Sequence, residues 1–197
     1  MERESPSVVV LAGPNGAGKS TLASNLLIGA LRVSEFVDAD VLARTLPRSE
    51  AAAVAAGRAV LRRLDELAAG RRSFGFETTL ASRSFVPRIR RLIMSGYECH
   101  LVFLWLSSAD LAVARVADRV RLGGHSVPEE TVRRRYRSGV RNFFGLYRPL
   151  TTTWRMYDNS ADDPRLIASG AGAETLTIND GDAWHCVRAE AGHEGQH

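Results

Sequence analysis

The hydrophobic positions of the chain form short runs, typical of buried β-strands, that alternate with longer segments of helical periodicity. Apolar and aromatic runs predict five main strands near residues 8–11, 35–37, 73–76, 100–106 and 155–157, and two short added strands at 165–169 and 174–178. Helical patterns with their start and stop residues predict helices at 21–31, 49–69, 83–95, 107–122 and from residue 128 onward. The last of these helices has an apolar stripe that is expected to pack into the core, formed by Val132, Tyr136, Val140, Phe143 and Tyr147.

A glycine-rich loop follows the first predicted strand. It matches the pattern G-x-x-x-x-G-K-[ST], with a strand before it and a helix after it, which is the context in which this pattern binds phosphates. The glycines let backbone N–H groups point at the phosphates of a nucleotide, Lys19 offers an ammonium to the β/γ oxygens, and Ser20 offers a hydroxyl to Mg²⁺. The sequence therefore predicts a site for ATP and Mg²⁺ made by Gly13, Pro14, Asn15, Gly16, Ala17, Gly18, Lys19, Ser20 and Thr21.

The alternation of strands and helices predicts a mainly parallel sheet with helices on both faces. The expected fold class is an α/β phosphate-loop NTPase of the kinase type: a three-layer sandwich with a mainly parallel five-stranded sheet and a helical, arginine-bearing lid. We expect one kinase domain over residues 1–188, with the lid at about 110–141, and a flexible C-terminal tail at 189–197. Ligands are expected beyond the carboxyl ends of the parallel strands.

The charged residues sharpen this interpretation. The 197 residues include 26 lysines and arginines against 22 aspartates and glutamates, yet the only lysine is Lys19 in the phosphate loop. The arginines are spread evenly and aromatic residues make up only 7% of the chain, so a dedicated nucleic-acid groove is not expected. No apolar stretch is long enough to span a membrane and the N-terminus lacks a signal pattern, so we expect a cytoplasmic protein with no membrane partner.

Two large classes of phosphate-loop protein do not match the rest of the chain. Transporter ATPases need a serine-glycine-glycine-glutamine signature and a hydrophobic strand that ends in Asp-Glu, and the chain has neither. A GTPase would need an Asn-Lys-x-Asp run, which a chain with no lysine beyond Lys19 cannot form. A small nucleotide-dependent kinase remains.

Polar residues at the ends of the second and third predicted strands are candidates for binding the phosphoryl acceptor. Asp40 is expected beside the acceptor hydroxyl as a general base, while Asp38 either shares this role or caps a helix. Glu77 and Thr78 are expected beside the acceptor, where a carboxylate next to a hydroxyl suits a sugar or ribose diol better than an anionic phosphate. The acceptor is therefore expected to present a sugar hydroxyl.

Arginines in the second half of the chain indicate a lid over the nucleotide. Arg119 lies in a helix that is expected to be packed, and a glycine-containing turn separates this helix from an arginine-rich one. A helix, a glycine hinge and a second helix with arginines are what a lid over a triphosphate requires. Arg119 and Arg134 are expected to stabilise charge on the transferring phosphoryl group, with Arg133, Arg135 and His125 as alternatives to Arg134.

Taken together, these segments resemble the zeta toxin family of phosphate-loop kinases, in its shorter stand-alone branch. The blocks that carry the resemblance are residues 8–21, 36–40, 74–80, 119–120, 123–128, 133–136 and 157–160. The resemblance implies ATP/Mg²⁺-dependent phosphorylation of a sugar hydroxyl on UDP-N-acetylglucosamine, with Asp40 as the base and lid arginines on the phosphates. It also implies an antitoxin-like protein partner.

Two other functions stay open from the sequence. One is a kinase for a nucleoside, a nucleotide or a nucleic-acid end, whose binding to several backbone phosphates would weaken steeply with salt. The other is a non-catalytic, nucleotide-dependent binding module, in which Asp40 would be dispensable.

Overall fold

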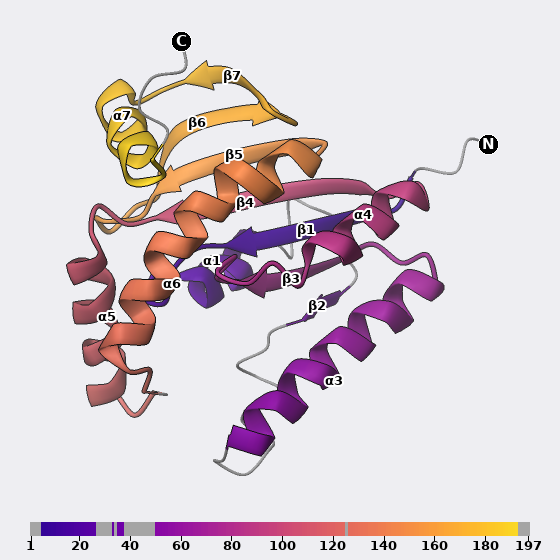
Figure 1. Ribbon diagram of the computed structural model, residues 1–197, viewed down its shortest axis with the longest axis horizontal. Helices are drawn as coiled ribbons and strands as arrows, with labels where there is room; N and C mark the ends of the chain where they lie inside the picture. The colour runs from indigo at the N-terminus through magenta and orange to yellow at the C-terminus, as the bar shows by residue number, and fades with distance from the viewer. Residues whose placement is uncertain (1–4, 27–32, 34, 38–49, 125, 193–197) are drawn as a thin grey trace.

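The computed structural model of the protein describes residues 5–26, 33, 35–37, 50–124 and 126–192 (Figure 1). Its strands form one seven-stranded sheet in the order β2-β3-β1-β4-β5-β6-β7. The strands are β1 (Ser7–Ala12), β2 (Glu35–Val37), β3 (Phe74–Thr78), β4 (Glu98–Trp105), β5 (Thr153–Asp158), β6 (Arg165–Ala171) and β7 (Glu174–Ile178). The first five strands are parallel to one another, whereas β6 and β7 are antiparallel additions at one edge.

The expected five-stranded sheet is therefore correct for its parallel part and too small as a whole. Both added runs join the same sheet, because β6 turns back after β5 and pairs with it, and β7 then pairs with β6. An antiparallel hairpin needs only a short connection and no crossover helix, so the chain can extend the sheet within a few residues.

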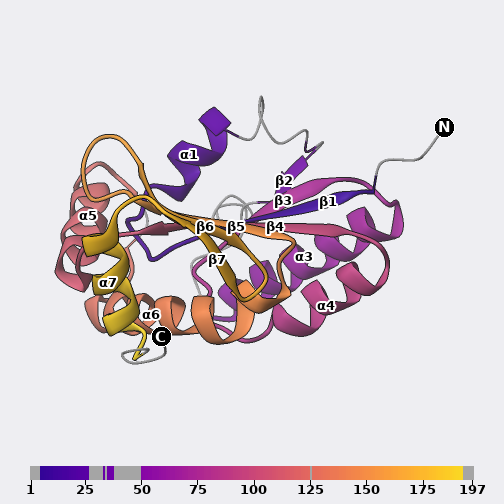
Figure 2. The same ribbon diagram turned by 90° about the horizontal axis from the view of Figure 1, so that it is seen from above.

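Helices cover both faces of the sheet, as the three-layer prediction requires. The α-helices are α1 (Lys19–Leu26), α3 (Glu50–Ala69), α4 (Val86–Met94), α5 (Ala109–Arg121), α6 (Glu129–Asn142) and α7 (Gly181–Glu190). Figure 2 shows α1 on one face of the sheet, and α3, α4, α6 and α7 on the other. None of the helices in the described ranges has the length and hydropathy needed to cross a membrane.

The central strand β1 explains why both faces must be covered. Val8 and Val10 enter one hydrophobic core, while Val9 and Leu11 enter the core on the opposite face. All four side chains are at most 2% exposed. Side chains alternate between the two faces of a strand, so an uninterrupted apolar run places valines in both cores at once.

The helix α6 continues directly into a π-helical turn (Phe143–Tyr147) and a short 3₁₀ turn (Arg148–Leu150). The predicted apolar stripe is buried along this whole segment, from Val132 to Tyr147. The helix α5 has Ser108 as its N-cap, because the Ser108 side chain accepts a hydrogen bond from the Leu111 N–H at 3.1 Å.

The C-terminal boundary also differs from the prediction. The helix α7 includes residues 189 and 190, and Ala191 is buried, so the expected flexible tail does not begin at residue 189. Asp180 starts this helix by accepting a hydrogen bond from the Ala183 N–H at 3.0 Å. Residues 193–197 lie outside the described part of the chain.

Candidate active site

The phosphate loop connects the end of β1 to the start of α1. All three of its glycines have positive φ angles, +146° at Gly13, +81° at Gly16 and +79° at Gly18, which other residues rarely adopt. A Cβ atom at Gly13 would lie 2.4 Å from the Leu104 carbonyl oxygen, and one at Gly18 would lie 2.7 Å from Nδ2 of Asn159. At Gly13 and Gly18, both the backbone shape and the neighbouring atoms therefore require glycine.

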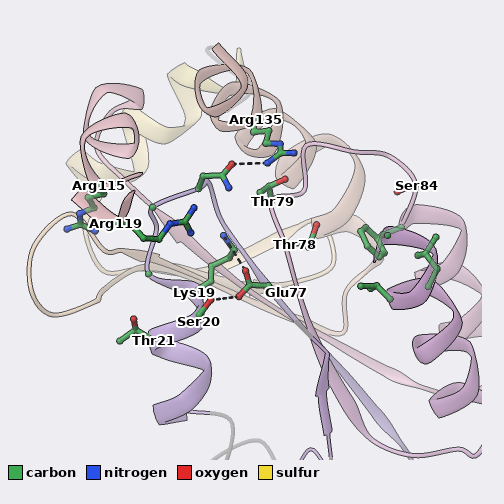
Figure 3. A pocket seen from close by; sticks show the side chains of 17 residues that line it. Lys19, Ser20, Thr21, Glu77, Thr78, Thr79, Ser84, Arg115, Arg119 and Arg135 are labelled. Atoms are coloured by element: carbon green, nitrogen blue, oxygen red, sulfur yellow. Dashed lines mark hydrogen bonds and ion pairs between the residues drawn. The ribbon is translucent and has the colours of Figure 1, made fainter. Parts of the chain in front are cut away.

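Lys19 is folded into this loop and is only 7% exposed. Its Nζ donates hydrogen bonds to the carbonyl oxygens of Gly13 and Pro14, both at 3.0 Å. The ammonium also lies 4.0 Å from Oε1 of Glu77, at the end of β3 (Figure 3). A compact positive charge is thus held at the centre of the loop, where the phosphates of a nucleotide would meet it.

Glu77 and Ser20 face each other beside this lysine. The Ser20 hydroxyl donates a hydrogen bond to Oε2 of Glu77 at 3.1 Å (Figure 3). The strand register brings the two side chains together. The strand β3 runs parallel to β1, and Glu77 lies opposite Leu11, near the end of β1 from which the phosphate loop starts. A hydroxyl and a carboxylate are the oxygen ligands that suit Mg²⁺, so the donor set fits the metal expected at Ser20.

This geometry adds a second role to the one expected for Glu77. Its carboxylate contacts Lys19 and Ser20 on the phosphate side, and its role at the acceptor stays a prediction. Thr78 and Thr79 follow it and line the adjoining cavity. The Thr78 hydroxyl oxygen accepts a hydrogen bond from the Leu80 N–H at 3.1 Å, which leaves its own hydrogen available to donate.

The segment after β5 supports the phosphate loop from the other side. Nδ2 of Asn159 donates to the Ala17 carbonyl oxygen at 2.8 Å. Arg115 on α5 in turn donates to the carbonyl oxygens of Asn159 (2.6 Å) and Ser160 (2.9 Å). Arg115 therefore holds in place the segment after β5 that contacts the loop. Sequence reasoning placed 157–160 among the family-like blocks but gave Asn159 no role, since a strand-end asparagine has no pattern of its own.

The carboxylate of Asp158 strengthens the same support. Burial alone would raise its pKa, but hydrogen bonds from the Ser160 hydroxyl and N–H, and one from Arg165 at 3.0 Å, outweigh burial and lower that pKa. Asp158 thus stays ionised and holds the turn that carries Asn159.

Arginines from the two lid helices lie on the opposite side of the loop. Figure 3 shows Arg119 directed from α5 toward the phosphate loop and Lys19. Arg135 on α6 donates to Oδ1 of Asn15 at 3.3 Å, so it reaches the loop itself. Arg133 instead joins the two helices, with ion pairs to Asp110 at 2.6 Å and Glu129 at 2.8 Å.

The structure therefore favours Arg135 over Arg134 as the second arginine of the site. Arg134 is exposed and does not line the cavity, although it was the residue expected there. Consecutive helical residues point about 100° apart, so only one of the three arginines can face the loop, and sequence alone could not choose between them. His125, the other alternative, lies outside the described residues.

These groups surround a cavity of about 560 Å³ with two different walls (Figure 3). The arginine wall consists of Arg115, Arg119 and Arg135. The hydroxyl-bearing wall lies across the loop, on the side of β3, α3 and the N-terminus of α4, and consists of Gly57, Val60, Leu61, Thr78, Thr79, Ser84 and Phe85. Lys19, Ser20 and Glu77 lie between the two walls.

The two aspartates expected to act on the acceptor, Asp38 and Asp40, fall outside the described residues. The strand that precedes them is described, and its last residue, Val37, pairs with Phe76, one residue before Glu77. Their roles stay predictions.

Comparison with known proteins identifies the family. The family model for zeta toxin matches residues 1–160 of the chain, which includes the phosphate loop, Glu77 and the lid arginines. The chain belongs to the zeta toxin family. An uncharacterized protein of Haemophilus influenzae is 29% identical to this zeta toxin family member over 130 residues, covering 65% of this chain and 91% of that protein.

Solved structures share the fold of this zeta toxin family member. A chain of the AvrRxo1-ORF1:-ORF2 complex with ATP superposes with a TM-score of 0.71 at 16% identity and 92% coverage of this chain. The chain spans 63% of the length of that relative. A structure from the PezAT chromosomal toxin–antitoxin system of Streptococcus pneumoniae gives a TM-score of 0.65 at 15% identity, with coverage of 100% of this chain and 82% of that one. Family membership and the phosphate loop together support a nucleotide-dependent kinase.

Proposed function

We propose that this protein transfers the γ-phosphoryl group of ATP to a sugar hydroxyl of a small molecule, and that UDP-N-acetylglucosamine is the first acceptor to test. The observation that carries the proposal is the cavity itself, which joins a phosphate loop to a wall of hydroxyl and apolar side chains. Such a cavity can hold a triphosphate and a neutral, hydroxylated group side by side. This pairing is what a small-molecule kinase needs.

The described residues divide the work of phosphoryl transfer. Lys19 would contact the β/γ oxygens of the nucleotide, and Ser20 and Glu77, which face each other beside it, would supply oxygen ligands for Mg²⁺. The bound metal would neutralise charge on the phosphates. Arg119 and Arg135 approach from the lid, where guanidinium groups stabilise the charge that the transferring group spreads over its oxygens.

The acceptor side completes the reaction. The acceptor oxygen forms a bond to the γ-phosphorus, the bond between this phosphorus and the β/γ bridging oxygen breaks, and ADP leaves. Asp40 takes the proton of the acceptor hydroxyl in this proposal, with Asp38 as the second carboxylate of the pair. Thr78, Thr79 and Ser84 offer hydroxyls to the sugar, and Val60, Leu61 and Phe85 cover its apolar faces.

A sugar acceptor is supported by the chemistry of the hydroxyl-bearing wall. Its seven residues carry three hydroxyls and no positive charge, so it offers no cationic partner to an anionic phosphate. Phosphates on the acceptor would have to lie nearer the arginines. A nucleotide sugar combines the two requirements, because its sugar and its diphosphate are at opposite ends of a short linkage.

The test compares ATP consumption with and without UDP-N-acetylglucosamine, followed by phosphorus NMR of the product. We expect only slow hydrolysis without the acceptor and a new phosphomonoester signal with it. Asp40→Asn should keep ATP affinity and lower phosphoryl transfer by about 10²–10⁴. Lack of stimulation by UDP-N-acetylglucosamine would reject this acceptor, and a larger loss at Asp38→Asn would make Asp38 the base.

An antitoxin-like protein partner forms part of the proposal. It is supported by the family and by relatives from AvrRxo1-ORF1:AvrRxo1-ORF2 and from the PezAT toxin–antitoxin system. A chain that needs such a partner should arrest growth when it is expressed alone in a bacterial host. Lys19→Ala should relieve the arrest, and equal growth with both chains would contradict a toxic activity.

A further inference from the structure

The last elements of the chain lie beyond the part that the zeta toxin family model matches. That match ends at residue 160, whereas β6, β7 and α7 follow it. The last residue of α7 is Glu190, which is exposed as a residue but turns its carboxylate toward the sheet and the lid. Oε2 of Glu190 accepts hydrogen bonds from Nε1 of Trp105 at 3.0 Å and from the Tyr136 hydroxyl at 2.8 Å.

The helix that carries Glu190 is firmly anchored. Trp184 and Val187 on α7, and Ala191 directly after it, are at most 6% exposed and form one apolar side. The Trp184 ring lies 5.4 Å from that of Phe144 and stacks on that of Trp154 at 5.9 Å. Packed aromatic rings of this size hold a short helix in one position, so the carboxylate at its end has a fixed place.

Tyr136 connects this carboxylate to the phosphate loop. It is 3% exposed, and its hydroxyl also lies 2.7 Å from the Leu106 carbonyl oxygen, just past the end of β4. The residue before it on α6 is Arg135, whose guanidinium donates to Asn15 of the phosphate loop. Glu190 therefore holds together the end of β4, through Trp105, and the lid helix, through Tyr136.

We propose that Glu190 is a positioning residue that fixes α6 against the end of β4, so that Arg135 is held over the phosphate loop. A carboxylate suits this task because a single oxygen accepts from both donors. The C-terminal unit is thus a brace for the lid, built from residues outside the family match. The kinetic consequence of this brace rests on the kinase function proposed above, whereas the brace itself can be measured without it.

Hydrogen exchange of the α6 amides tests the brace directly. Glu190→Ala removes both hydrogen bonds, and we expect exchange over residues 129–142 to become about ten-fold faster. Glu190→Gln keeps an acceptor oxygen and should stay within about two-fold of the parent. Asp182→Asn is the control, because Asp182 is an exposed acid of the same helix that no described hydrogen bond or ion pair engages.

Unchanged exchange in α6 for Glu190→Ala, or equal changes for Glu190→Ala and Asp182→Asn, would overturn the proposal. If Glu190→Ala does not fold, Tyr136→Phe removes only the hydroxyl and should give the same faster exchange in α6. A Tyr136→Phe protein with the exchange of the parent would overturn the proposal as well.

The kinetic test uses ATP consumption with ATP itself as the varied substrate. We expect Glu190→Ala to lower kcat about ten-fold and to leave the KM for ATP within about two-fold, because Lys19 and the loop stay in place. In an Arg135→Ala background, Glu190→Ala should have no further effect, since its action passes through Arg135. Additive losses would overturn this route of action. A parent protein that consumes no ATP would reject the kinase function, and hydrogen exchange would then decide the brace alone.

Discussion

The two walls of the cavity differ in charge, in origin and in support. The arginine wall comes from α5 and α6, and its arginines contact the loop or its supports, as Arg135 contacts Asn15 and Arg115 contacts Asn159. The hydroxyl-bearing wall comes from β3, α3 and the segment before α4, and no described ion pair involves any of its residues.

This difference predicts that the protein separates two tasks. Guanidinium groups recognise phosphate oxygens, whereas hydroxyl and apolar groups recognise a neutral, ring-shaped molecule. Substitutions in the arginine wall should therefore change the chemical step on ATP, and substitutions in the hydroxyl-bearing wall should change the affinity for the acceptor. Substitutions in either wall that change both the chemical step and the affinity for the acceptor would contradict this division.

The largest effect is expected at Lys19, which lies between the two walls. Lys19→Ala should lower ATP turnover by about 10³-fold or more, because it removes the charge that faces the β/γ oxygens. Lys19→Arg should fail similarly, since a guanidinium is broader than the space between the Gly13 and Pro14 carbonyls that holds the ammonium. Steady-state assays with a thermal melt of each variant provide the check, and turnover at the parent rate would refute the phosphate-loop site.

Arg119 tests the arginine wall. Arg119→Ala should lower kcat by about 10³-fold, in the range of arginines that contact a transferring phosphoryl group. Arg137→Ala is the matched control on the same lid, because Arg137 is exposed and does not line the cavity, and it should stay within about two-fold. Small and equal effects in a single-turnover assay would show that the arginines do not act in transfer.

Leu61 tests the hydroxyl-bearing wall. It is partly buried on α3 and lines the cavity. Leu61→Ala should raise the KM for the acceptor about ten-fold, the effect of losing apolar contact in a pocket, and leave the KM for ATP unchanged. The measurement varies UDP-N-acetylglucosamine and ATP in turn. An equal rise in both values would mean that the two walls do not divide the substrates as proposed.

The smallest effect concerns the pH dependence of stability at the brace of the lid. Burial raises the pKa of Glu190, and hydrogen bonds from Trp105 and Tyr136 offset only part of that rise. A carboxyl whose pKa is higher in the folded state contributes stability that is fully present below its unfolded pKa of about 4.3, and loses it as the pH rises through the folded pKa.

Glu190→Gln cannot ionise and should lack this loss. Its Tm relative to the parent should therefore rise between about pH 4.5 and pH 7, by no more than about 2 °C because the residue is exposed at the surface. Thermal melts across this range, with Asp182→Asn as the control, measure the difference. A constant difference in Tm, or one that falls with pH, would contradict the raised pKa.

The parallel half of the fold was predictable because local signals there agree with one another. The apolar run around Val8–Leu11, the glycine loop and the helical stripe from Val132 to Tyr147 each have a residue pattern that fits only one kind of local structure. The antiparallel edge was harder, since β7 is exposed along its whole length and has no apolar run that would show which sheet it joins. The helix α7 was missed, although its Asp180 N-cap and its buried stripe of Trp184 and Val187 are visible afterwards.

The candidate site shows a similar division. Residue type and spacing predicted roles for Lys19, Ser20 and Arg119, because each belongs to a pattern with a chemical meaning, and all three line the cavity. They could not tell Arg134 from Arg135, since that choice depends on how α6 is rotated against the sheet. They also could not show that Glu77 faces Ser20, because this contact joins residues 57 positions apart in sequence.

The kinase function can be tested by mass spectrometry of a metabolite extract incubated with the protein and ATP. We expect one or more metabolites, each with a sugar hydroxyl, to gain the mass of a single phosphate, and no gain with the Lys19→Ala protein. A phosphorylated nucleotide sugar in the parent sample would support the roles proposed for both walls. An extract in which no compound gains a phosphate, from a protein that binds ATP, would contradict a kinase and favour a nucleotide-dependent binding module.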